Sequence, residues 1–141
     1  MKNFSLLLLL ITTISFSSCK KDSSPEEKNA KNIVGKWQLT SVTQKSHKNG
    51  TLEGEQTHHV EGNNVTTEFR NNGTGVDGDG DEFTYKISGS KIIISYKDED
   101  ENTEGEIKKL NSNDLVIYIE EINVQGKDTY KYSWEETFLK K

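Results

Sequence analysis

Two glutamates and a set of aromatic residues are the side chains whose placement would give them a binding role. By strict apolar–polar alternation, Glu121 and Glu136 fall on the same strand faces as the apolar residues around them. Because a buried, unpaired carboxylate is unfavourable, each must lie near an opening, pair with a lysine, face a ligand, or be turned outward by a bulge or strand end. Aromatic rings either line a ligand cavity or fill the core. The candidate lining residues are Tyr85, Tyr96, Tyr130, Tyr132 and Trp134.

Two acidic segments suggest a cation site at first sight. Asp77 to Glu82 places a carboxylate at every second position, and oxygen-rich loops of this kind hold Ca²⁺. The EF-hand pattern fails, because Glu82 stands in place of the loop glycine and Ser88 in place of the bidentate glutamate. The segment Asp98–Glu101 fails at the same two places. We therefore expect solvated hairpin loops, with no metal and no cofactor.

Histidine and serine residues offer no clear catalytic arrangement. His47, His58 and His59 are the only histidines, and zinc could use two of them, but adjacent residues on a strand point to opposite faces. We expect them on the surface. No serine lies in a Gly-x-Ser-x-Gly turn. The sequence therefore predicts a protein that is not an enzyme.

The charge of the chain excludes one class of partner. Its 141 residues include 18 basic and 23 acidic side chains, which gives a net charge of −5. Such a protein has no general attraction to nucleic acid. Arg70 is the only arginine, whereas phosphate and base-edge recognition depend on bidentate guanidinium groups. We therefore exclude nucleic acid as a partner.

The elements that position these residues are predicted to be strands. Ala30 is the only alanine, so the best helix former is almost absent, while apolar and polar residues alternate from Lys36 onward. A weaker strand near Thr57–Val60 would bring the number of strands to about eight. The apolar positions of the clear strands are Trp37 and Leu39; Val65, Thr67 and Phe69; Phe83, Tyr85 and Ile87; Ile92, Ile94 and Tyr96; Ile107; Leu115, Ile117 and Ile119; and Tyr130, Tyr132, Trp134 and Phe138.

The connections between these strands indicate an antiparallel meander. They are short and rich in turn formers, and Gly89-Ser90 suits a two-residue hairpin. No connection has room for a crossover helix, so neighbours in sequence are expected to pair. An up-and-down sheet of about eight strands closes into a barrel. The predicted fold class is all-β, a small closed barrel, with two packed sheets as the alternative.

The first nineteen residues are typical of a secretory signal. Lys2 is followed by an apolar stretch from Phe4 to Phe16 that is too short to span a membrane, and small residues precede Cys19. This arrangement resembles the lipobox of bacterial lipoproteins, although Phe16 stands where leucine is usual. The resemblance implies that residues 1–18 are removed and that Cys19 carries acyl chains such as palmitate. Several chains hold a protein stably on a bilayer.

The resemblance also implies a location. Because Lys20 rather than aspartate follows the cysteine, the expected location is the outer membrane, on its periplasmic face or at the cell surface. Residues 19–32 then form a lipidated, polar linker. The spacing of Ser24 and Glu27 is that of a capping box. This spacing is compatible with a short helix over Pro25–Val34, and a plain linker is the alternative. The folded domain is expected to span residues 33–141.

The domain itself resembles a second family. Gly35-Lys36-Trp37 is similar to the Gly-x-Trp signature of lipocalins, and the order of strands and turns is similar to that of the small lipocalin-like domains of bacterial lipoproteins. The resemblance implies a barrel with Trp37 at a closed end and a ligand cavity at the other. In lipocalins a late arginine often covers that tryptophan. Here the last strand offers Lys131 and Lys140 instead.

Two functional hypotheses follow from these resemblances. In the first, a lipid-anchored, lipocalin-like barrel binds a small apolar or amphipathic ligand without catalysis. In the second, a filled barrel presents its acidic loops to an unidentified protein partner. A continuous cavity lined by the candidate residues would favour the first hypothesis, whereas a packed interior would favour the second.

Overall fold

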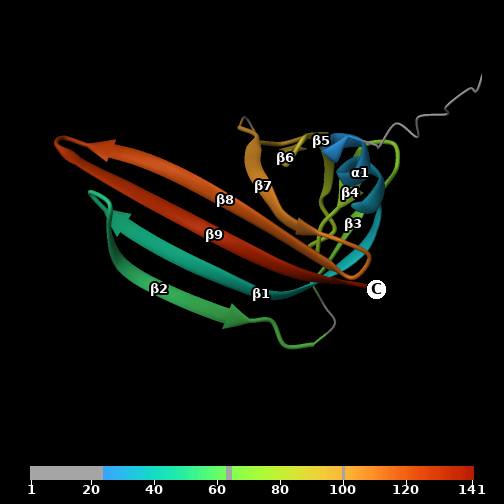
Figure 1. Ribbon diagram of the computed structural model, residues 1–141, viewed down its shortest axis with the longest axis horizontal. Helices are drawn as coiled ribbons and strands as arrows, with labels where there is room; N and C mark the ends of the chain where they lie inside the picture. The colour runs from blue at the N-terminus through green and yellow to red at the C-terminus, as the bar shows by residue number, and fades with distance from the viewer. Residues whose placement is uncertain (1–23, 63–64, 100) are drawn as a thin grey trace, which may run out of the picture.

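The computed structural model describes residues 24–62, 65–99 and 101–141, which form one short helix and a nine-stranded antiparallel sheet (Figure 1). The predicted signal, the predicted lipidation site Cys19, Asn63, Asn64 and Asp100 lie outside the described residues. The elements are α1 (Pro25–Asn32), β1 (Gly35–Lys48), β2 (Thr51–His59), β3 (Thr66–Phe69), β4 (Thr74–Val76), β5 (Glu82–Ser88), β6 (Lys91–Tyr96), β7 (Thr103–Leu110), β8 (Asp114–Gln125) and β9 (Asp128–Lys140).

The sheet closes on itself, which confirms the predicted antiparallel barrel. The strand order is β2-β1-β3-β4-β5-β6-β7-β8-β9, and the first long strand, β1, also pairs with the last strand, β9. Eight strands therefore form a closed ring, and β2 lies outside it as a ninth strand. Closure removes the exposed edges that an open sheet would present over the ring.

The membership of the ring differs from the sequence prediction. The weak strand near Thr57–Val60 belongs to β2, which pairs only with β1 and adds nothing to the ring. Its place is taken by β4, three residues long, which the alternation did not show. The central residue of β4 is Gly75, and a Cβ there would stand 2.1 Å from Cζ of Phe83. A glycine lets the Phe83 ring lie directly against the backbone of β4.

The core inside the closed ring consists of side chains that the apolar–polar alternation predicted to face inward. Trp37 and Leu115 are fully buried, and Phe69 and Ile92 are nearly so. The Phe69 ring makes an edge-on contact with the Tyr85 ring at a centroid distance of 5.1 Å. Burying a side chain of this size contributes on the order of 1.5–3 kcal/mol. Every ring strand except β4 thus contributes one or more inward side chains to a single core.

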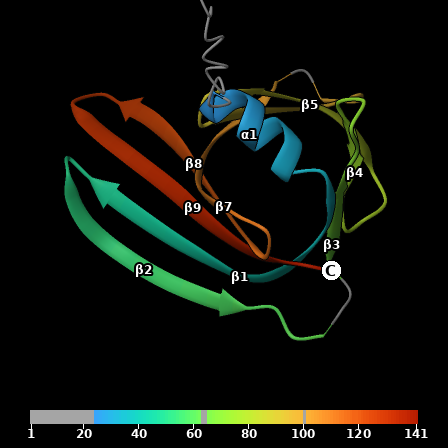
Figure 2. The ribbon, with the colours of Figure 1, turned by 45° about the vertical axis from the view of Figure 1, so that its right-hand side comes forward.

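One end of the ring is closed by α1 (Figure 2). The helix begins with the predicted capping box, in which the Ser24 hydroxyl accepts from the Glu27 amide at 3.2 Å. At its other end Ile33 is fully buried, and the Ile33 carbonyl accepts from Nε1 of Trp37 at 2.6 Å. Asn29 also donates to the carbonyl of Gly89 in the β5–β6 turn, at 2.9 Å. These contacts place Trp37 at the closed end.

A lysine covers Trp37 where lipocalins often have an arginine. Nζ of Lys140 lies 4.7 Å from the centroid of the Trp37 ring and donates to the carbonyl of Val34 at 2.8 Å. Lys131 instead forms an ion pair with Glu120 on the outer face, at 3.3 Å. Of the two lysines that the sequence offered, Lys140 is therefore the one that contacts the tryptophan.

Beyond the ring, four strands form a projecting sheet. It is made of β2, β8, β9 and the second half of β1, and it extends away from α1 (Figure 1). Residues Gly35–Gln38 of β1 pair with β3, whereas Ser41–Lys48 pair with β2 along the same edge. A register shift between Leu39 and Ser41 marks the point where β1 leaves the ring.

No helix in the described part of the chain has the length and apolar character to cross a membrane.

Candidate functional site

A cavity of about 200 Å³ opens at the end of the ring opposite to α1, which we term the barrel mouth. Strand β5 fixes this orientation, because it runs from the loop 77–81 at the mouth to the turn that contacts α1. Most of the walls are apolar, and the polar lining comes from one loop and from single positions on three strands. The lining residues are Leu39, Val65, Thr67, Phe69, Asp77, Gly78, Asp79, Phe83, Ile94, Tyr96, Ile117, Glu136 and Phe138.

Glu136 reaches this cavity because the register of β9 is unbroken. It stands opposite Ile117 of β8 and Val42 of β1, so it lies on the inward face with both of them. No bulge turns it outward. Burial raises the pKa of the Glu136 carboxyl above its usual value. Among the described residues, no side chain or amide forms an ion pair or a hydrogen bond with Glu136.

The loop that lines the mouth holds one carboxylate in a fixed position. The Oδ1 atom of Asp77 accepts hydrogen bonds from the amides of Asp79 and Asp81, each at 3.0 Å. The Asp77 amide donates to the Asp81 carbonyl at 3.0 Å, and the Gly80 amide donates to the Asp77 carbonyl at 3.2 Å. This is the local chemistry that makes aspartate a turn former. Asp77 therefore orders the whole loop while its charge faces the cavity.

Tyr96 lies between this loop and the aromatic core. Burial raises the pKa of the Tyr96 hydroxyl, and the charge of Asp77 and a hydrogen bond to it raise that pKa further. The Tyr96 ring is 5.7 Å from the Phe83 ring, centroid to centroid, at a tilt of 58°. Both rings line the cavity. The mouth thus combines two aromatic rings with the carboxylates of Asp77 and Glu136.

The residues that the sequence suggested for ligand binding lie in three different places. Tyr96 and Glu136 meet at the mouth. Tyr85 is buried in the core, where its hydroxyl donates to the carbonyl of Arg70 at 2.7 Å, and it does not line the cavity. The others lie on the projecting sheet, on the face that continues the inside of the ring: Glu121, Tyr130, Tyr132 and Trp134.

That continuing face carries a second hollow of about 320 Å³. Tyr132 and Trp134 line it together with Gln44 and Gln56 from the neighbouring strands. Tyr132 stands opposite Glu121, which is exposed. The row of aromatic residues along β9 therefore begins at the mouth and runs out along the projecting sheet.

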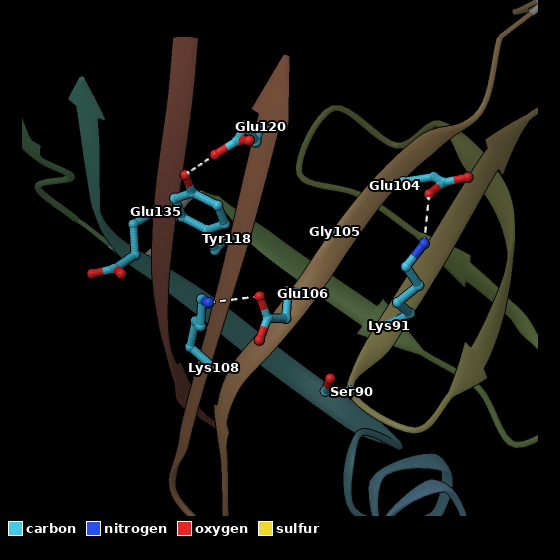
Figure 3. Close-up of a pocket in the computed structure, with 9 residues that line it drawn as sticks. All are labelled: Ser90, Lys91, Glu104, Gly105, Glu106, Lys108, Tyr118, Glu120 and Glu135. Atoms are coloured by element: carbon cyan, nitrogen blue, oxygen red, sulfur yellow. Dashed lines mark hydrogen bonds and ion pairs between the residues drawn. The ribbon is translucent and has the colours of Figure 1, made fainter. Parts of the chain in front are cut away.

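A larger hollow of about 810 Å³ lies on the outside of the ring (Figure 3). Two ion pairs lie in the hollow: Nζ of Lys91 is 3.2 Å from Glu104, and Nζ of Lys108 is 2.6 Å from Glu106. The Tyr118 hydroxyl donates to Glu120 at 2.5 Å, and this hydrogen bond is the main cause that lowers the pKa of the Glu120 carboxyl. Because the hollow lies open on the outer surface and is lined almost wholly by polar and charged residues, it is a weaker candidate than the mouth.

The other sequence candidates do not assemble into a site. His58 and His59 lie side by side on β2, opposite Val42 and Ser41, while His47 is at the far end of β1. Over residues 24–62, 65–99 and 101–141, no group of three or more His, Cys, Asp or Glu side chains is arranged to hold a metal ion. Asp77 and Asp79 were considered in the sequence only as calcium or solvent-facing residues. Their position at the mouth depends on ring closure, which no local pattern shows.

Comparison with known families agrees with this geometry. Residues 33–117 match the family model described as the lipocalin-like domain, and the match includes Gly35 and Trp37. No curated protein and no solved structure matched the chain. The family match covers more than half of the sequence and falls on strands of the closed ring. This protein therefore belongs to the lipocalin-like family.

Proposed function

We propose that this protein binds a small amphipathic ligand at the barrel mouth, without catalysis. The observation that carries the proposal is a cavity in which apolar walls meet Glu136, a carboxylate without a partner among the described residues. Mostly apolar walls with a few convergent polar groups are common to small-molecule sites. A ligand with a polar head would offset the desolvation of Glu136, which a packed barrel would leave unbalanced.

A cavity-filling variant tests this proposal. Ile94→Trp places a large ring in the cavity, whereas Ile122→Trp adds the same ring on the exposed projecting sheet. Native mass spectrometry of protein purified from its own membranes should show a bound small molecule in the wild type and in Ile122→Trp, but not in Ile94→Trp. Thermal melting checks that both variants fold. A wild-type protein that carries no small molecule and takes none up from a panel of amphiphiles would contradict the proposal.

We also propose that Cys19 anchors the domain to the outer membrane, on its periplasmic face or at the cell surface. The support is the sequence alone: a short apolar stretch, small residues and then a cysteine. Cys19→Ala should move the protein from the membrane fraction to the soluble fraction, while Ser23→Ala, after the cysteine, should leave it bound. Mass spectrometry should find acyl chains on an N-terminal peptide that begins with Cys19. A wild-type mature chain that begins at another residue would refute the anchor.

A second candidate function is binding of a protein partner, and the projecting sheet favours it. Ile122 and Val124 are 63% and 68% exposed, on the part of β8 that extends beyond its pairing with β7. Exposed apolar residues beside an unpaired strand edge are typical of interaction surfaces. The same native mass spectrum would then retain a protein subunit, and Ile122→Lys would release it.

A further inference from the structure

The barrel mouth is lined by acidic groups and by no basic group. Asp77, Asp79 and Glu136 all line the cavity, whereas none of its lining residues is a lysine, an arginine or a histidine. Asp77 and Asp79 come from the β4–β5 loop, and Glu136 comes from the opposite wall, on β9. Three acidic residues from two separate parts of the chain therefore line one small cavity.

Many acidic residues outside the mouth are instead paired with a cation. Eight of the described acidic residues form an ion pair with a lysine or with Arg70 on the surface, as Glu120 does with Lys131 at 3.3 Å and Glu104 with Lys91 at 3.2 Å. Within the described part of the chain, Asp77, Asp79 and Glu136 have no such cation, and Oδ1 of Asp77 accepts from the backbone amides of Asp79 and Asp81. The mouth is thus a site of uncompensated negative charge next to apolar walls.

Aromatic rings in the same cavity add to this preference. Phe83 and Tyr96 lie 5.7 Å apart, and Phe69 lies 5.5 Å from Phe83, all measured between ring centroids. The faces of aromatic rings attract cations electrostatically, and the attraction is stronger where water is excluded. Carboxylates and aromatic rings together select for a positively charged group that also has apolar surface.

We propose that the ligand at the barrel mouth is a small organic cation, with an alkylammonium head against Glu136 and the 77–79 loop and a short apolar tail between Leu39 and Ile117. This inference rests on the proposed function and specifies its ligand class. The tail must be short, because the cavity of about 200 Å³ is smaller than the roughly 300–1,000 Å³ usual for drug-sized ligands. The head gains most from Glu136, since a charge pair is strongest where the dielectric constant is low.

The proposal carries a pH dependence of defined sign. The groups that face Glu136 across the mouth are Asp77 and Asp79 from the loop and the Tyr96 hydroxyl from β6, while β1, β3 and β8 present uncharged residues. Burial raises the pKa of Glu136 above its usual value. A cation favours the ionised form, so its binding should release protons and tighten as pH rises through that pKa.

Three ligands of similar length test the head preference. Hexylammonium and 1-hexanol share a six-carbon tail and hexanoate has a five-carbon tail, so they differ chiefly in the charge and nature of the polar group, and each is titrated into the full chain by calorimetry and by NMR. We expect hexylammonium to bind at least tenfold more tightly than 1-hexanol, and hexanoate to bind more weakly than both. Chemical shift changes should fall on residues of the mouth, with the amide of Asp79 among them.

Matched variants test the role of the half-buried Glu136 carboxylate. Glu136→Gln keeps the shape and removes the charge, and it should reduce hexylammonium affinity at least tenfold while 1-hexanol affinity stays within twofold. Glu135→Gln makes the same change one residue away, on the exposed outer face, and should leave all three affinities unchanged. Asp79→Asn, in an exposed part of the loop, should reduce hexylammonium affinity by a smaller factor and serves as a second probe should Glu136→Gln fold poorly.

Each outcome distinguishes this inference from the proposed function. If 1-hexanol binds the mouth as tightly as hexylammonium, the barrel is a binding protein but its ligand class is not cationic. If hexanoate binds most tightly, the inference is again overturned and the proposed function stands. If none of the three ligands moves a resonance of the mouth, both the inference and the proposed function fail.

Discussion

The Nζ atom of Lys140 lies 4.7 Å from the centroid of the Trp37 ring, and this contact joins the last strand to the first. The same atom donates to the carbonyls of Asn32, at 3.2 Å, and of Val34, at 2.8 Å. One ammonium group thus covers the tryptophan and satisfies two backbone acceptors where the chain passes from α1 into β1. Gly35 makes this approach possible, since a Cβ there would stand 2.8 Å from Cε of Lys140.

Replacement of Lys140 should weaken the closed end. Lys140→Met removes the cation–π contact and two hydrogen bonds, and we expect the free energy of unfolding in urea to fall by about 1–2 kcal/mol. Lys131→Met removes only an exposed ion pair with Glu120 and should cost less than about 1 kcal/mol. Equal losses in the two variants would show that the contact with Trp37 contributes nothing beyond surface charge.

A methyl group at Gly75 should disturb the ring. Gly75→Ala places its Cβ 2.1 Å from Cζ of Phe83 and 2.6 Å from the carbonyl oxygen of Glu68. Such overpacking is expected to lower the free energy of unfolding by about 3 kcal/mol. Gly54→Ala, on the projecting sheet, meets only the flexible Ser46 hydroxyl at 3.1 Å and should change stability by less than about 0.5 kcal/mol. The prediction fails if the Gly75 variant melts with the wild type.

Glu136 should make the protein less stable as the pH rises. Because burial raises the pKa of this carboxyl in the folded state, its favourable contribution is present below the ordinary pKa of 4.5 and is lost as pH rises through the folded value. Glu136→Gln does not titrate, so its stability relative to the wild type should increase as the pH rises from 4.5 through the raised pKa of Glu136 in the folded state. Urea unfolding across this range measures the difference. Glu135→Gln should show no such trend, and a flat difference for Glu136→Gln would be the contrary result.

Asp77 should order the loop at the mouth through its oxygen atoms rather than its charge. Asp77→Ala removes the acceptor of two amide hydrogen bonds and should speed hydrogen exchange at the amides of Asp79 and Asp81. Asp77→Asn keeps an acceptor at the same place and should preserve most of the protection. Asp81→Ala, which leaves both bonds intact, is the control. Loss of protection in the asparagine variant would mean that charge, not geometry, holds the loop.

The sequence predicted the ring well wherever one face of a strand is buried. Alternation located the inward residues of β5 and β6 because each contributes to the core on every second position. It missed β4, whose inward position is Gly75, since a glycine carries no apolar signal. On β8 the apolar positions that alternation identified stop at Ile119, although the strand continues to Gln125. Beyond Ile119 the apolar residues move to the other face, because the core has ended and no buried side remains to fix the pattern.

The candidate site was only partly predictable for a related reason. Glu136 could be identified because it interrupts an apolar face, and the structure places it at the mouth. Its partners in the cavity come from the loop 77–81, about sixty residues earlier in the chain, so only closure of the ring brings them together. Tyr130, Tyr132 and Trp134 share the face of Glu136, yet they lie beyond the ring. Strand pattern shows which face a residue occupies, but it does not show where along the strand the barrel ends.

Pairing of β1 with β9 determines when the barrel can fold. The ring is sealed by its first and last strands, and β9 comprises thirteen residues at the very end of the sequence. The ring cannot close before β9 has been synthesised, and the search for this pairing spans almost the whole domain. Folding should therefore be slow for a protein of this size.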